Sequence, residues 1–177
     1  MAGPPHALSD MAAMTLRLLL RLQVGVLAIG TAFAWFTLVG DYRRFFSAGG
    51  RVFEWSGCPV ANPLLTPCFY GALAFLGAFI WALALLRSPP EAAAGRQRGL
   101  NWLLAAGSVF AWGNFAYELF LYTERRPASA FSCPPPGEAP VHPLMAPCFY
   151  GAVIFLGALA VSLAILKIRR RAARRIA

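Results

Sequence analysis

The hydrophobic positions of this chain gather into four long runs, and most charged residues and prolines fall between the runs or at their ends. Each run has the length of an α-helix that crosses a hydrocarbon core, which takes about 20 residues. The pattern therefore predicts an all-α, polytopic membrane protein built as a bundle of four transmembrane helices. The expected spans are 18–39, 67–86, 100–122 and 147–166.

The segments outside the spans are short, which leaves no room for a separate soluble domain. Two halves of similar plan are expected, each made of a helix, a loop and a second helix. The expected divisions are an N-terminal tail 1–16, a first half 17–87 with its loop 40–66, a linker 88–99, a second half 100–167 with its loop 123–146, and a basic tail 168–177.

Composition supports the membrane assignment. The chain is 59% hydrophobic and only 13% charged, whereas soluble domains carry about 25% charged residues. Its formal net charge of +9 does not indicate nucleic acid, because the charges flank apolar runs. The lipid bilayer is the expected partner.

The basic residues also predict an orientation. Eleven of the sixteen Lys and Arg lie in the tails 1–16 and 168–177, the linker 88–99 or the adjoining span ends. Lys and Arg accumulate on the cytoplasmic side of membrane proteins. Both termini are therefore expected in the cytoplasm, and the loops 40–66 and 123–146 outside it.

A duplicated segment covers the start of the second helix in each half. The segment 62–78 recurs as 142–158, and 12 of the 17 positions from Asn62 to Ala78 are identical in the second copy. The first helices match as well, since Gly30, Phe33, Ala34 and Trp35 recur in order at positions 107, 110, 111 and 112. Because the segment 30–35 matches an internal helix, we expect it to be a retained span rather than a signal-peptide cleavage site.

Two tandem copies of a two-helix unit must point the same way across the membrane. They are expected to be related by a pseudo-two-fold axis along the membrane normal. A proline suits the first position of a helix, and Thr66 is expected to cap the second helix. Aromatic residues at interface depth and small residues would dock these helices. The docking residues are Pro67, Phe69, Tyr70 and Gly71, with Pro147, Phe149, Tyr150 and Gly151.

The four cysteines all lie in the two loops or at the helices that follow them. An even number of cysteines on an oxidising side indicates disulfides. Because each unit had to be viable before duplication, the favoured pairs are Cys58–Cys68 and Cys133–Cys148. The alternative is redox chemistry, since Cys68 and Cys148 each lie in the first turn of a helix, where a thiolate is stabilised.

The layout of four spans, internal termini and a cysteine pair in each outer loop resembles the bacterial disulfide-bond formation protein B family. That resemblance implies thiol–disulfide oxidoreductase activity. The family has a Cys-x-x-Cys pair at the start of its second helix, and here Gly71 stands three positions after Cys68. The family also lacks two near-identical halves.

A metal site would use Cys133, His142 and Cys148 as soft ligands. The first half has Asn62 where a second histidine would stand, so the duplication does not favour a ligand role. No metal and no other cofactor is predicted.

Three polar residues near the outer ends of the first helices form a candidate intramembrane site. Asn114 and Glu118 share one helix face, and the alignment of the two first helices pairs Glu118 with Asp41. Ionisable groups at membrane depth are costly and are often functional. The competing interpretation is that they end the helix at the interface and pair with neighbouring arginines, which are Arg43, Arg44, Arg125 and Arg126.

The sequence carries no phosphate-binding loop, metalloprotease helix or nucleophile elbow. It therefore favours a non-enzymatic subunit, scaffold or assembly factor, with other membrane subunits or a second copy as partners. The Ala- and Arg-rich composition and short loops indicate a bacterial inner membrane. The alternatives are the oxidoreductase and an oligomeric transporter or channel lined by Asp41, Asn114 and Glu118.

Overall fold

The computed structural model of the chain describes residues 5–51, 62–124 and 142–174. These residues form helices and turns, and no strand occurs among them, which confirms the all-α class. A short 3₁₀ turn precedes the second and the fourth α-helix. In chain order the elements are α1 Pro5–Ser47, η1 Pro63–Leu65, α2 Pro67–Leu86, α3 Pro90–Thr123, η2 Pro143–Met145 and α4 Pro147–Arg174.

The helix bounds differ from the expected spans mainly at the ends remote from the loops. Helix α2 coincides with the expected span 67–86, but α3 begins at Pro90 rather than at position 100. The segment predicted as the linker 88–99 is therefore mostly helix. Pro90 is suited to a first helical position, and the alanines that follow it favour helix. Apolar length predicts how much of a helix crosses a membrane, not where the helix ends.

Three of the helices are long and apolar enough to cross a membrane among the residues that the structure describes. They are Ala13–Ser47, Pro67–Leu86 and Pro147–Ala172. Helix α3 is long enough but less apolar, and it does not meet the same criterion. The chain is thus a helical membrane protein by the length and composition of three helices.

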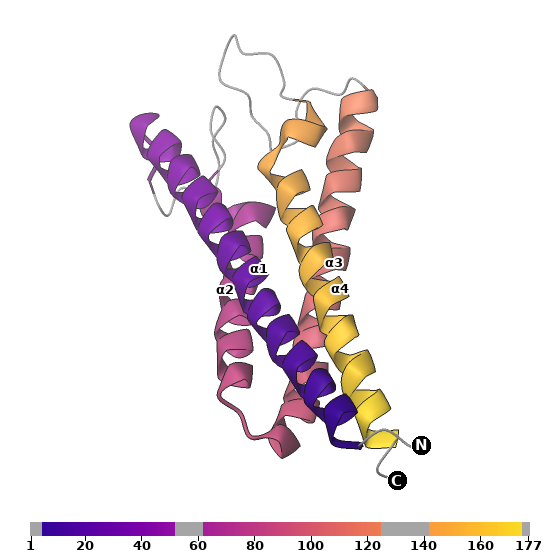
Figure 1. Cartoon of the computed structure of the whole chain (residues 1–177). Coiled ribbons are helices and arrows are strands. Elements are labelled where there is room, and N and C mark those ends of the chain that lie inside the picture. Colours follow the sequence, from indigo (N-terminus) through magenta and orange to yellow (C-terminus); the bar gives the residue numbers. More distant parts are fainter. Residues whose placement is uncertain (1–4, 52–61, 125–141, 175–177) are drawn as a thin grey trace.

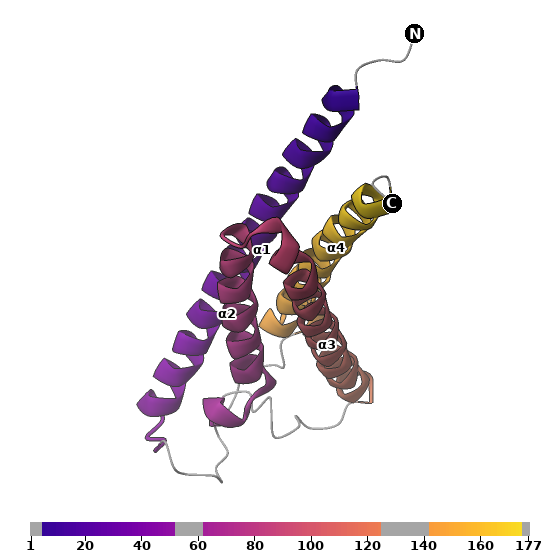
Figure 2. The same ribbon diagram turned by 90° about the horizontal axis from the view of Figure 1, so that it is seen from below.

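The four helices pack as a bundle in which α1 contacts α2 and α4, and α3 contacts α4 and α2. Figure 1 shows the start of α1, the α2–α3 turn and the end of α4 at one end of the bundle, which we call the turn end. At the opposite end, the loop end, α1 and α3 finish and α2 and α4 begin. Figure 2 shows α2 lying beside α1 and α3 beside α4.

The core runs along the middle of the bundle and centres on two phenylalanines from the duplicated segment. Phe75 on α2 and Phe155 on α4 are each 2% exposed, and their ring centroids lie 3.9 Å apart. Leu27 on α1 and Leu104 on α3 are fully buried in the same cluster. Each of the four helices therefore contributes to one continuous core.

Two glycines let each phenylalanine approach the first helix of its own half. A Cβ on Gly107 would lie 2.7 Å from Cε1 of Phe155, and one on Gly30 would collide with the ring of Phe75. Gly71 and Gly151, expected to support close helix contact, have no neighbour within 4 Å of the place that a Cβ would occupy. The close approaches therefore use the glycines of α1 and α3, and those of α2 and α4 leave open space.

Large apolar side chains are exposed on several sides of the bundle. In water such a surface would favour association, whereas lipid tails accommodate it readily. The most exposed examples are Phe36 at 82%, Met14 and Trp102 at 76%, and Val109 at 74%.

Candidate functional site

The loop end is organised by two matching helix starts. Pro67 and Pro147 are the first residues of α2 and α4. The backbone N–H of Leu64 donates to Asn62 Oδ1 at 3.1 Å, and that of Leu144 donates to His142 Nδ1 at 3.3 Å. Asn62 and His142 occupy equivalent positions, so two different side chains hold the same turn.

The prediction that Thr66 caps the second helix is confirmed for its position and wrong for its side chain. Thr66 occupies the N-cap position of α2, but its side chain makes no capping hydrogen bond. Its hydroxyl instead donates to the backbone oxygen of Pro63 at 2.7 Å. The reason is the 3₁₀ turn, which brings the Pro63 carbonyl within reach before the helix begins.

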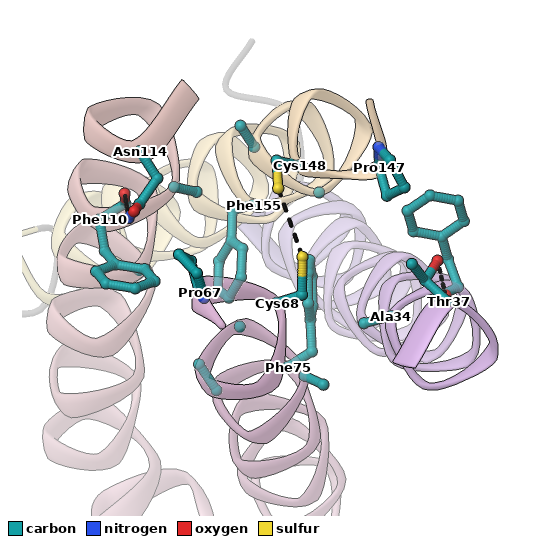
Figure 3. A pocket seen from close by; sticks show the side chains of 18 residues that line it. Ala34, Thr37, Pro67, Cys68, Phe75, Phe110, Asn114, Pro147, Cys148 and Phe155 are labelled. Atoms are coloured by element: carbon teal, nitrogen blue, oxygen red, sulfur yellow. Dashed lines mark hydrogen bonds between the residues drawn. The ribbon is translucent and has the colours of Figure 1, made fainter. Parts of the chain in front are cut away.

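Two cysteines from these helix starts face each other across the bundle. The Sγ atoms of Cys68 and Cys148 lie 3.5 Å apart, with one thiol donating to the other (Figure 3). Both residues are half-buried free thiols. A disulfide has an S–S length of about 2.05 Å, so the two sulfurs are neighbours that are not bonded in this structure.

The favoured pairs Cys58–Cys68 and Cys133–Cys148 stay predictions, because Cys58 and Cys133 lie outside the described residues. What the structure adds is a neighbour from the other half for each described cysteine. No local spacing in the sequence indicated this contact, because the two thiols belong to different halves of the chain. A pseudo-two-fold axis passing near both equivalent cysteines would have suggested it.

The two carboxylates of the candidate polar site have different surroundings. Glu118 is half-buried, and the Cys148 thiol donates to its Oε1 across 3.9 Å. Asp41 forms an ion pair with Arg44, with Oδ1 and Nη2 2.9 Å apart. The expected arginine pairing is therefore present for Asp41, while Glu118 contacts the thiol pair.

A small cavity of about 70 Å³ lies beside the thiols. Its walls come from all four helices, and most of its lining residues are apolar. Thr37 and Asn114 are equivalent residues in its lining, and each donates to the carbonyl of the preceding helical turn, at 3.0 Å and 2.7 Å. Figure 3 shows Asn114 and Thr37 on opposite sides of the cysteine pair. The cavity thus presents chiefly apolar surface and two thiols.

The aromatic members of the docking motif pack mainly in the second half. Phe149 contacts Phe115 with ring centroids 5.2 Å apart, and Tyr150 contacts Phe33 at 6.1 Å. Phe69 contacts the neighbouring ring of Tyr70. These contacts anchor the start of α4 to both α1 and α3.

No group of three or more His, Cys, Asp and Glu that can hold a metal ion occurs among the described residues. His142 uses Nδ1 as a turn acceptor, and its ring contacts Tyr122 with centroids 5.2 Å apart. Cys133, considered as a companion ligand, lies outside the described residues.

A second polar cluster lies nearer the turn end and was not anticipated. Gln97 Nε2 donates to Gln23 Oε1 at 3.2 Å and to Ser162 Oγ at 3.0 Å. All three side chains are fully buried and join α3, α1 and α4. Gln97 was missed because it fell within the predicted linker, where its side chain would be exposed. If the helix that starts at Pro90 had been predicted, Gln97 could have been placed on its buried face.

Comparisons with known proteins do not identify the chain. No family model, curated protein or solved structure matches it.

Proposed function

We propose that the protein is a four-span membrane protein made of two tandem, parallel two-helix units. Helices α2 and α4 both start at the loop end and are both apolar enough to cross a membrane. If both cross in the same direction, α3 must carry the chain back between them, although α3 is less apolar. The pseudo-two-fold relation is supported by the matched residues Phe75 and Phe155 meeting near the middle of the bundle.

We further propose a bacterial inner membrane, with both termini cytoplasmic and the loop end outside. The distribution of Lys and Arg supports this orientation. In that arrangement the thiols of Cys68 and Cys148 lie on the side where disulfides form and persist.

We propose that the cysteine pair carries out thiol–disulfide exchange with an extracytoplasmic dithiol. The observation that carries this proposal is the distance of 3.5 Å between the Sγ atoms of Cys68 and Cys148. The sequence alone favoured a non-enzymatic subunit, scaffold or assembly factor. Two thiols at helix starts, beside a cavity and a carboxylate, favour the oxidoreductase alternative instead.

One round of exchange needs no further oxidant, because the partner dithiol is oxidised as the Cys68–Cys148 disulfide is reduced. One thiolate of the partner dithiol bonds to a sulfur of the Cys68–Cys148 disulfide, and the S–S bond breaks, leaving the other cysteine with the electron pair. The second thiol of the partner then attacks the mixed disulfide. Two electrons and two protons pass to the cysteine pair, and the partner becomes a disulfide. The same steps in reverse reduce a partner disulfide.

The test uses the full chain with Cys58→Ser and Cys133→Ser, which retains only the cysteines of the site. In membranes, we expect that oxidised glutathione converts Cys68 and Cys148 to a disulfide that cannot be alkylated. Dithiothreitol should reduce this disulfide and make both cysteines available for alkylation again. In the Cys68→Ser and Cys148→Ser variants, the remaining cysteine should form a mixed disulfide with the partner that can be trapped. A pair that stays oxidised through the whole cycle, with no mixed disulfide in either variant, would show a structural staple and overturn the proposal.

A further inference from the structure

The duplication places a carboxylate near each cysteine, but the two halves use it differently. Asp41 and Glu118 occupy equivalent positions on the first helices of the two halves. The Asp41 carboxylate is held by the Arg44 guanidinium on its own helix at 2.9 Å. Glu118 is instead the acceptor for the Cys148 thiol at 3.9 Å. Among the described residues, the Glu118 carboxylate has no ion pair that neutralises it.

The Glu118 carboxylate contacts the sulfur of Cys148 and not that of Cys68. Cys148 and Glu118 are both half-buried at the loop end, and Cys148 lines a cavity whose walls are mainly apolar. Water competes weakly for a proton in such a setting, and charges interact more strongly there than in bulk water. Besides Glu118, the titratable groups that interact with each thiol are the opposite cysteine of the pair and Asp41 on α1, whose carboxylate is paired with Arg44. Of the two thiols that the structure describes, only that of Cys148 has a carboxylate as a hydrogen-bond partner.

We propose that Glu118 is the acid–base group of the cysteine pair, and that it serves Cys148 as the leaving sulfur. This inference rests on the exchange function proposed above. An incoming thiolate bonds to Cys68 Sγ, the Cys68–Cys148 bond breaks, and Cys148 leaves with the electron pair. The protonated Glu118 carboxyl gives its proton to the Cys148 thiolate. When the disulfide forms again, the Glu118 carboxylate takes that proton back.

The proposal assigns different roles to two equivalent cysteines. Because the leaving sulfur is the one that receives a proton, Cys68 is the sulfur that carries the mixed disulfide with the partner. The Cys148→Ser variant should therefore trap a mixed disulfide on Cys68 at least several times faster than the Cys68→Ser variant traps one on Cys148.

The decisive measurement is the reduction rate of the Cys68–Cys148 disulfide by dithiothreitol, in the full chain with Cys58→Ser and Cys133→Ser. We expect Glu118→Gln to slow the reaction on the order of 100-fold at about pH 5, within the range of general acid–base catalysis. The ratio of the parent rate to the Glu118→Gln rate should fall as the pH rises, because a deprotonated carboxyl has no proton to give. Dithiothreitol titrates identically in both reactions, so its own pH dependence cancels in the ratio.

Asp41→Asn is the matched comparison, since it removes the equivalent carboxylate, which makes no hydrogen bond to a thiol, and the pH profile of this variant should keep the form of the parent profile. Glu118→Asp keeps a carboxyl and should recover part of the lost rate, which separates proton transfer from misfolding. Equal pH profiles for the parent and Glu118→Gln, with exchange intact, would overturn the role of Glu118 alone. A pair that does not exchange in the parent would overturn the proposed function itself.

Discussion

At the scale of single residues, a glycine of one helix lets a phenylalanine of the next helix pack close to its backbone. The ring of Phe155 lies against Gly107, and it also contacts the tilted ring of Phe75, with centroids 3.9 Å apart. A ring held by both contacts cannot move away without disturbing its neighbours. The missing side chain at Gly107 is therefore a packing requirement rather than a source of flexibility.

Substituting Gly107→Ala should destabilise the protein by about 1–3 kcal/mol, the usual cost of overpacking a core. The new Cβ would stand 2.7 Å from the Phe155 ring. Gly113→Ala on the same helix is the control, because nothing lies within 4 Å of its Cβ position. Alanine favours helix over glycine, so this variant should be neutral or slightly stabilised. Unfolding in mild detergent measures both, and equal stabilities would contradict the packing role.

The residue pattern predicted equivalent positions better than it predicted roles. Aligning the two halves paired Gly30 with Gly107 and the two phenylalanines with each other, but the alignment carries no information about which helix each ring meets. Asn62 and His142 differ in chemistry, and in the sequence this difference counted only as an argument against a metal-ligand role for His142. Their side chains nevertheless accept from equivalent backbone N–H groups, because an amide oxygen and an imidazole nitrogen are both acceptors.

At the scale of helices, hydropathy located the apolar runs and missed the polar contact that joins them. Gln97 bridges Gln23 and Ser162 through its one amide nitrogen. The second half has Ser162 where the first has Ala82, so this contact distinguishes the two halves. Its detection depends on knowing that α3 extends back to Pro90, a feature set by local helix propensity rather than by apolar length.

A double-mutant cycle with Gln97→Ala and Ser162→Ala should reveal coupling between α3 and α4. Hydrogen bonds between helices in a membrane contribute about 0.6 kcal/mol on average, and we expect a coupling energy of that order. Ser162→Ala alone should cost little, because the equivalent residue in the first half is already alanine. The free energy of unfolding of the four proteins in detergent gives the coupling. Strictly additive effects would mean that the 3.0 Å contact contributes nothing to helix association.

At the scale of the whole molecule, the arrangement of the helix ends makes the topology testable at three points. Ala48 follows α1 at the loop end, Arg87 lies at the α2–α3 turn, and Glu124 follows α3 at the loop end. All three residues are exposed. Together they report on the crossings by α2 and α3, and α3 is the helix whose hydropathy does not by itself indicate a span.

Single cysteines at these positions, in a full chain with the four native cysteines replaced by serine, should label in alternation. We expect a membrane-impermeant maleimide to modify Ala48→Cys and Glu124→Cys in intact cells, and Arg87→Cys only after permeabilisation. The expectation follows from the excess of Lys and Arg at the turn end and from the need for α3 to return the chain to the loop end before α4 begins. Inverted labelling would reverse the orientation and place the thiol pair in a reducing compartment, where a stable disulfide is disfavoured. Labelling of Arg87→Cys and Glu124→Cys on the same side would show that α3 does not cross, and the four-span architecture would fail with it.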